Sequence, residues 1–389
     1  MHRHIVIGRG LIGSAAARHL AKSTDGVVCI GPDEPTDRAA HTGVFASHYD
    51  EGRLTRIFDP MQEWSITAKR AIARYRDIEE RSGVQFFTPS GFLGLGAPGN
   101  DYTDRGAATG IANGAKISRL DVDQIRQHFP FLSVRDDVDG VLETATAGHV
   151  SPRRLVRAQS ILAEKAGATL VRQHVTAVRG ANGGVEVELA DGSTVTGENA
   201  LIATGAFTQP CGLSPVELGL TVYGRTVLLA RVEGELEQAL ESMPTMVASE
   251  NGSYILPPIR YPDGHKYVKI GIGTDADPRF AALADLQTWF KGPGSESDRV
   301  AYKRFFTSLI PALQDCQHWH TDSCAITKTV SGLPIIDFVH DRTIAVAVGA
   351  CGKGAKGSDE WGRIAADLLR GAEGPADVSS AQLSLRSKP

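Results

Sequence analysis

The first thirty residues carry the pattern that most restricts the fold of this chain. Apolar residues at 4–7 predict a short buried strand, and the sequence Gly-Arg-Gly-Leu-Ile-Gly follows at 8–13. An alanine-rich helix is expected over 14–22, and a second apolar strand over 26–30. This order of strand, glycine turn, helix and strand is typical of a unit that binds a dinucleotide. We therefore expect a Rossmann-like domain at this position.

Each glycine of the turn has its own physical role. Gly8 permits the tight turn, Gly10 lets the backbone approach a pyrophosphate, and Gly13 lets the helix lie close to the strand. The backbone N–H groups of the first helical residues, which include Leu11 and Ile12, then face the phosphates. A purely structural turn is the alternative. The strand before the turn and the helix after it favour the dinucleotide site.

The acidic residue that such a unit places on the ribose, about 20 residues further on, is displaced in this sequence. The end of the second strand holds Gly31 and Pro32, and the acids Asp33 and Glu34 follow directly. We expect one of these two carboxylates to take the ribose role, and we assign Asp33.

The composition is that of an ordinary globular protein. Its 389 residues suffice for two domains and a large core. A net charge of −4 gives no reason to expect nucleic acid or an anionic membrane as a partner, and no long apolar run predicts a membrane span. Five scattered cysteines favour reduced thiols over a disulfide framework. We expect a cytoplasmic protein, a monomer or homodimer, without a metal-binding motif.

The rest of the chain alternates between two kinds of secondary-structure pattern. A long helix is predicted over 61–82, and antiparallel strands dominate the segments after it. Further on, strands alternate with helices again, as in the first unit. This part includes a tight turn at 182–184 and a last helix over 360–370. The predicted fold class is α/β combined with α+β, a Rossmann-like nucleotide domain with an inserted, mostly antiparallel substrate domain. We assign residues 1–85, 145–218 and 320–389 to the nucleotide domain, and 86–144 and 219–319 to the substrate domain.

Five further motifs follow the glycine turn in a fixed order. They are Ser-His-Tyr-Asp-Glu-Gly-Arg-Leu-Thr-Arg at 47–56, Ala-Thr-Gly-Ala at 203–206, Lys-Ile-Gly at 269–271, Cys-Ala-Ile-Thr-Lys-Thr at 324–329 and Gly-Ala-Cys-Gly-Lys-Gly-Ala-Lys-Gly at 349–357. Together they resemble the amino-acid oxidase (DAO-type) family of FAD enzymes, and most closely its monomeric sarcosine oxidase and N-methyl amino acid oxidase branch. The resemblance implies a GR2-type flavoprotein that binds FAD and oxidises a CH–NH or CH–NH2 group.

The resemblance also implies which residues contact FAD. Besides the glycine turn and Asp33, they are Ser47, His48, Arg53, Thr204, Gly205, Cys324, Gly352, Gly354 and Lys356. From its position on the strand after the helix over 155–166, Val175 is assigned to the adenine through its backbone. Cys324 matches the cysteine that bonds to the flavin 8α-methyl carbon, a bond that needs a thiolate, which the cations Arg53 and His48 would favour. Cys351 is the competing cysteine, and we assign it to packing.

Three basic residues are implied in catalysis. Arg56 and Lys356 would clamp the substrate carboxylate, one as a planar fork and the other as a point charge. Lys269 would stabilise developing superoxide, so that O2 is reduced to H2O2. The substrate, a small and in particular an N-substituted amino acid, would lose a hydride equivalent to become an imine. No separate catalytic base is identified.

The substrate pocket departs from the sarcosine oxidase pattern. Gly273 and Lys353 replace histidines, Ile326 replaces an aromatic residue, and Ile255 replaces a tyrosine. The small cage that fits sarcosine is therefore not reproduced, and we expect sarcosine not to be the best substrate. Tyr254, Tyr223 and Lys353 are expected to shape a roomier pocket that favours anionic groups.

Three alternatives to an oxidase stay open at this point. The first is a flavin dehydrogenase that passes electrons to a quinone or a partner protein. The second is a flavoprotein subunit of a larger amine-oxidising complex. The third is an NAD-dependent dehydrogenase, which rests on the opening glycine turn alone.

Overall fold

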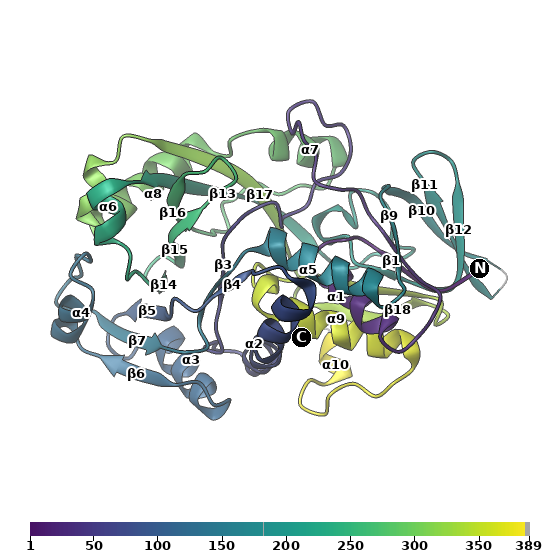
Figure 1. Cartoon of the computed structure of the whole chain (residues 1–389), viewed down its shortest axis with the longest axis horizontal. Coiled ribbons are helices and arrows are strands. Elements are labelled where there is room, and N and C mark those ends of the chain that lie inside the picture. The colour runs from purple at the N-terminus through teal and green to yellow at the C-terminus, as the bar shows by residue number, and fades with distance from the viewer. Residues whose placement is uncertain (182, 386–389) are drawn as a thin grey trace.

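The fold joins a parallel sheet covered by helices to a mostly antiparallel sheet that lies beside it (Figure 1). The structure, a computed structural model, describes residues 1–181 and 183–385. It confirms the predicted fold class of α/β combined with α+β. Within these residues, no helix is long and apolar enough to cross a membrane.

The first sheet has the order β10-β11-β12-β1-β2-β9, with β19 beside β12 and β18 at its edge. Strands β9, β2, β1, β12 and β19 are parallel, whereas β10, β11 and β18 pair antiparallel. The bounds are β1 His2–Ile7, β2 Val27–Ile30, β9 Thr169–Val171, β10 Val175–Ala181, β11 Gly184–Leu189, β12 Thr194–Ile202, β18 Ile335–His340 and β19 Ile344–Val348. The turn predicted at 182–184 includes Asn182, which lies outside the described residues.

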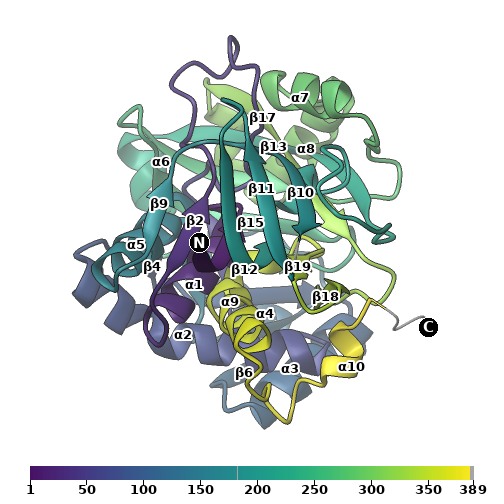
Figure 2. The same cartoon turned by 90° about the vertical axis from the view of Figure 1, so that its right-hand side faces the viewer.

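Helices α1 (Leu11–Ala21), α2 (Gln62–Ser82), α5 (Pro152–Lys165) and α9 (Gly354–Arg370) pack together against this sheet, as Figure 2 shows for α9 and α1 beneath the strands. The backbones of α1 and α9 approach closely at Gly362, where a Cβ would stand 2.5 Å from the Cβ of Ala15. The glycine therefore makes this close contact possible. The rings of Trp64 and Trp361 meet edge to face in the same core. A short helix, α10 (Ser380–Leu383), packs on β18.

Helix α9 begins six residues before the predicted start at 360, so Gly354 and Lys356 lie in its first turns and not in a loop. The sequence predicted a loop over the glycine-rich segment before residue 360, because each glycine disfavours a helix by about 1 kcal/mol. Burial outweighs that cost here, since Lys356 and Gly357 are buried against the neighbouring helices.

The second sheet has the order β17-β13-β16-β15-β14-β5-β7-β6, in which only β14 and β5 pair in parallel. Its strands are β5 Phe92–Gly96, β6 Ile117–Leu120, β7 Asp139–Glu143, β13 Thr221–Val232, β14 Thr245–Ala248, β15 Ser253–Arg260, β16 Lys266–Gly271 and β17 Trp319–Lys328. Its helices are α3 Asp101–Ala112, α4 Val122–His128, α6 Gly234–Ala239, α7 Leu283–Lys291 and α8 Glu296–Leu309. Two 3-10 turns are also present among the described residues, at Gly205–Phe207 and Pro311–Asp315.

Strand β17 belongs to this second sheet, although the sequence assignment places residues from 320 on in the nucleotide domain. It pairs with β13 from Thr221–Lys328 to Ala230–Trp319, so it is held by the ladder along its whole length. A small sheet of β3 (Arg53–Thr55), β8 (Gly148–Val150) and β4 (Phe87–Thr88) joins the two halves of the molecule.

The two faces of the second sheet differ in chemistry. Leu228, Val268 and Ile270 point to one face and pack in an apolar core with α8. The alternate residues, which include Arg225 on β13 and Lys269 on β16, point to the opposite face. Arg225 and Lys269 therefore face away from the apolar core.

Candidate cofactor and substrate site

A cavity of about 690 Å³ lies between the two halves of the molecule. It brings together most of the residues that the sequence singled out. Of these, it is lined by Gly8, Gly10, Leu11, Ile12, Ser47, His48, Arg53, Arg56, Val175, Thr204, Gly205, Tyr254, Cys324, Gly352, Lys353, Gly354 and Lys356. Gly13, Asp33, Lys269 and Tyr223 do not line it.

The glycine turn has the geometry that a dinucleotide requires. Gly8 has φ +104°, and a Cβ there would stand 2.4 Å from the carbonyl oxygen of Ala203. A Cβ on Gly13 would stand 1.8 Å from the carbonyl oxygen of Gly8, so Gly13 serves the packing of the turn. No side chain caps the N-terminus of α1, and its first turn holds no acid. Its N–H groups are therefore open to a diphosphate such as that of FAD.

Asp33 lies behind a basic residue that the sequence analysis missed. Its carboxylate accepts a hydrogen bond from Arg9 at 2.9 Å and pairs with Arg172 at 3.0 Å, and 57% of its side chain is exposed. Arg9 lines the cavity and also donates to the carbonyl oxygen of Gly31. Glu34, the other candidate acid, pairs with Arg153.

Arg56 lines the cavity and has no carboxylate partner among the described residues. It follows β3 and is buried, and its Nη2 donates to the Tyr102 hydroxyl at 2.9 Å. Its guanidinium lies 4.3 Å from the ring centre of Phe92, and its Nε has no hydrogen-bond partner. Among the described residues it makes no ion pair with a carboxylate. Its charge is therefore available to an anion in the cavity.

Lys356 already has an acidic partner, Asp59, which the sequence analysis missed. The Lys356 ammonium donates to buried Asp59 at 2.7 Å, and Lys353 donates to both oxygens of the same carboxylate at 3.1 Å. Burial raises the pKa of Asp59, but the two lysines outweigh it and hold that pKa below its usual value. Burial lowers the pKa of Lys356 to about 7, although Asp59 acts against this shift.

Lys269 lies beneath the lining and is almost fully buried. Its ammonium donates to Asp50 at 2.6 Å and to the carbonyl oxygen of Gly52 at 2.6 Å. Burial and the charge of Arg53 hold its pKa well below the usual value. Two residues further along β16, the hydroxyl of Tyr254 covers Gly271, where a Cβ would stand 2.4 Å from it.

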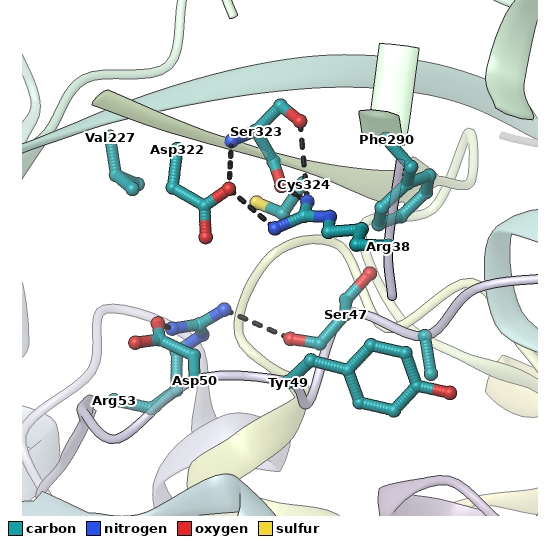
Figure 3. A pocket seen from close by; sticks show the side chains of 11 residues that line it. Arg38, Ser47, Tyr49, Asp50, Arg53, Val227, Phe290, Asp322, Ser323 and Cys324 are labelled. Atoms are coloured by element: carbon teal, nitrogen blue, oxygen red, sulfur yellow. Dashed lines mark hydrogen bonds and ion pairs between the residues drawn. The ribbon is translucent and has the colours of Figure 1, made fainter. Parts of the chain in front are cut away.

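Cys324 lines both the large cavity and a second, water-sized one of about 20 Å³. Figure 3 shows the small cavity with Asp322, Ser323 and Arg38 on one side and Asp50 and Arg53 on the other. Burial raises the pKa of the Cys324 thiol, and the charge of Arg53 opposes that effect without reversing it.

The prediction that His48 acts as a cation near Cys324 is wrong. Enclosure by protein, together with the charges of Arg153 and Arg53, lowers the pKa of His48 to about 3. The ring is therefore neutral at pH 7. Cys351, the competing cysteine, also lines the large cavity, and its thiol donates to the carbonyl oxygen of Gly349 at 3.1 Å.

The charges on the cavity wall are all of one sign. Seven basic side chains line it, and no Asp or Glu among the described residues does. The seven are Arg9, Arg53, Arg56, Arg225, Lys328, Lys353 and Lys356. Carboxylates stand behind six of them, at Asp33, Asp50, Asp59, Asp275 and Asp277. The cavity therefore suits an anionic ligand, and its chemistry fits a dinucleotide and a carboxylate.

Arg225 and Lys328 are further lining residues that the sequence analysis missed. Both contact the ring of Tyr223, at 5.3 and 4.9 Å from its centre. Tyr223, which was expected to shape the pocket, is buried behind these cations and does not line the cavity.

Known proteins share the sequence family and the fold of this chain. Residues 3–368 match the family model described as FAD dependent oxidoreductase. N-methyl-L-tryptophan oxidase of Citrobacter koseri is 24% identical over 393 residues, which cover 98% of each chain. L-proline dehydrogenase from P. horikoshii shares the fold with a TM-score of 0.79, 18% identity, and coverage of 99% of this chain and 96% of the other. Glycine oxidase from Geobacillus kaustophilus also shares the fold, with a TM-score of 0.75, 20% identity and full coverage of both chains. The chain belongs to the family of FAD-dependent oxidoreductases, as its motifs predicted.

Proposed function

We propose that this protein is an FAD-dependent oxidase of a small N-substituted amino acid, which it converts to an imine while O2 is reduced to H2O2. The observation that most supports the proposal is Arg56, a buried cation that lines the cavity without a carboxylate partner among the described residues. A buried charge of this kind is costly unless a ligand pairs with it. The similarity to an oxidase named for an N-methyl amino acid supports the same substrate class.

Arg56 and Lys356 hold the substrate carboxylate in this proposal. Arg56 offers two parallel N–H donors, and Lys356 adds a charge from the first turns of α9. Asp59 keeps the Lys356 ammonium in place at 2.7 Å. With its carboxylate fixed, the amino acid keeps one orientation of the C–N bond that reacts.

The glycine turn and the N-terminus of α1 would hold the diphosphate of FAD, and the backbone of Val175, which lines the cavity, would contact the adenine. When bound, FAD supplies the electron acceptor for the hydride equivalent that leaves the carbon next to nitrogen. Cys324 is the proposed attachment point for a covalent flavin. The imine leaves the site and is hydrolysed in water.

A dehydrogenase is the second candidate, and one observation favours it. Lys269, the cation proposed to act on O2, does not line the cavity. Its ammonium already donates hydrogen bonds to Asp50 and to the carbonyl oxygen of Gly52. In the oxidase proposal the positive charge of Lys269 stabilises the developing superoxide from behind the residues that line the cavity. In the dehydrogenase proposal its charge is compensated, and electrons pass to an acceptor other than O2.

The test is anaerobic reduction of the purified holoprotein by a panel of N-methyl L-amino acids, followed by absorbance. We expect bleaching of the flavin, and a dissociation constant that rises about 10- to 100-fold in R56Q, as for the loss of a charge-assisted pair. R105Q, an exposed change on α3, is the matched control and should behave as wild type. A protein that binds no FAD, or a flavin that no amino acid bleaches, contradicts the proposal.

Reoxidation then separates the two candidates. Rapid mixing of the reduced protein with air-saturated buffer should restore the flavin absorbance and release peroxide in an oxidase. Reoxidation no faster than that of free flavin, with rapid electron transfer to a quinone dye, assigns the dehydrogenase instead.

A further inference from the structure

Arg225 lies on the same face of the second sheet as Cys324. The two residues are direct partners in the ladder of β13 and β17, and directly opposed residues share a face. Val227, two residues along β13, faces the small cavity beside Cys324 (Figure 3). Arg225 itself lines the large cavity, as does Gly273, just beyond the end of β16. The guanidinium therefore lies in the cavity wall near the predicted flavin attachment point.

Gly273 gives this guanidinium its space. A Cβ at position 273 would stand 3.0 Å from Nε, 3.0 Å from Nη2 and 3.1 Å from Cζ of Arg225. Three nearly equal distances place the glycine over the flat face of the guanidinium. The sarcosine oxidase pattern has a histidine at this position. In this chain, an arginine from a different strand occupies the space that such a side chain would need.

The guanidinium has one satisfied end and one open edge. Nη1 contacts the Asp277 carboxylate and donates to the carbonyl oxygen of Thr274 at 3.3 Å. Within the described residues, neither Nε nor Nη2 donates a hydrogen bond. Asp277 is buried and does not line the cavity. The open Nε–Nη2 edge is the pair of parallel donors that matches a carboxylate.

The surroundings of Arg225 are also basic. Lys328, half-buried, lines the cavity and lies over the same Tyr223 ring. Arg279 lies 5.2 Å from the centre of that ring. The proposed carboxylate clamp of Arg56 and Lys356 has other neighbours, in Tyr102 and Asp59. The cavity thus has a second cationic group, built from different elements.

We propose that Arg225 is a specificity-determining residue that binds a second carboxylate, so that the preferred substrates are N-alkyl amino acids with an acidic side chain. The proposal rests on the proposed function, because it assigns the side-chain end of the same substrate.

The test compares charged and neutral substrates of matched size. N-methyl-L-glutamate and N-methyl-L-aspartate are compared with N-methyl-L-glutamine and N-methyl-L-alanine, by the rate of anaerobic flavin reduction. We expect the acidic substrates to have the higher second-order rate constant of flavin reduction. R225Q should lower this constant for the better acidic substrate about 10- to 100-fold, and leave it within about 3-fold for the neutral ones. R225K should recover part of the loss. R231Q, on the same strand and outside the cavity lining, is the matched control.

Two additions separate a specific effect from a folding defect. The double variant R225Q/D277N removes the buried acid together with its partner, and G273A displaces the guanidinium without removing it. Both should lose the preference for acidic substrates while they keep flavin absorbance. Equilibrium binding of glutarate against butyrate, followed by the flavin spectrum, gives a readout that needs no turnover. Glutarate should bind more tightly than butyrate to the wild type, and this difference should be absent in R225Q and in G273A.

The outcomes distinguish the two proposals. If neutral N-methyl amino acids reduce the flavin as well as or better than acidic ones, or if R225Q weakens all substrates equally, Arg225 does not set specificity and the proposed function stands. If no amino acid reduces the flavin, both proposals are refuted.

Discussion

The protonation of Lys356 gives the sharpest quantitative test of the substrate site. Its pKa is about 7, because burial and the charges of Arg56 and Lys353 lower it while Asp59 raises it. Its charge is therefore largely present at pH 6 and largely absent at pH 8.5. A carboxylate that pairs with Lys356 should bind more weakly as the pH rises through this range.

The magnitude follows from the pairing that is lost. A hydrogen bond to a charged group contributes about 1.5–3 kcal/mol, and with a pKa of about 7 for Lys356 the dissociation constant should rise about 8- to 25-fold between pH 6 and pH 8.5. Propionate is the suitable ligand, since it carries no amine whose own ionisation would obscure the result. Its binding is followed through the flavin absorbance of the holoprotein.

Two variants should move this pH dependence in opposite directions. D59N removes the charge that raises the pKa of Lys356, so the loss of affinity should move to lower pH. K353M removes a charge that lowers this pKa, so the loss should move to higher pH. Propionate affinity that is independent of pH, or a shift of both variants in the same direction, would refute this account of Lys356.

D59N should also weaken the fold, since removal of one partner from a buried ion pair costs about 3–5 kcal/mol. The sign of the pH effect can be stated for each group. Asp59 has a lowered pKa, so its contribution to stability is present above the unfolded value near 4 and is lost as the pH falls. Flavin content and thermal unfolding at pH 7 establish which variant preparations are folded.

Two further predictions concern the cofactor. G13A should abolish FAD binding, because its Cβ would overlap the carbonyl oxygen of Gly8 at 1.8 Å; a yellow G13A protein with a wild-type FAD content would contradict this reading of the turn. C324S should release into the supernatant any flavin that acid precipitation leaves in the wild-type pellet, whereas C351S should not. The reverse result would assign the bond to Cys351, and a colourless wild-type pellet would show that neither cysteine forms it.

The elements that were predicted well carry a repeating local signal. The strand, glycine turn and helix at the start of the chain are one example, and α2, predicted over 61–82, begins at Gln62. Their apolar periodicity or glycine spacing can be read from the local sequence without knowledge of tertiary contacts. The start of α9 was missed because helix propensity alone disfavours its glycines, and only packing against α1 and α2 stabilises that turn.

The missed site residues are isolated in the sequence. Asp59 follows Arg56 by three positions, but nothing local indicates that Lys356 folds onto it. Arg225 did carry a signal, since it is a basic residue within an otherwise mostly apolar strand. A charge inside such a strand is kept only with a partner or a cavity beside it. Its pairing with Asp277 depends on a long-range fold that no local pattern contains.

The lining of the large cavity spans residues from Ile7 to Lys356, so its walls are made at very different times during synthesis. The glycine turn leaves the ribosome early, whereas Cys324 and the start of α9 emerge only after most of the chain is made. A nascent chain thus carries the glycine turn long before it carries the last residues of the cavity wall. The complete cavity exists only after the chain has been made up to Lys356, so a ligand that needs both ends of the lining can bind only after that point.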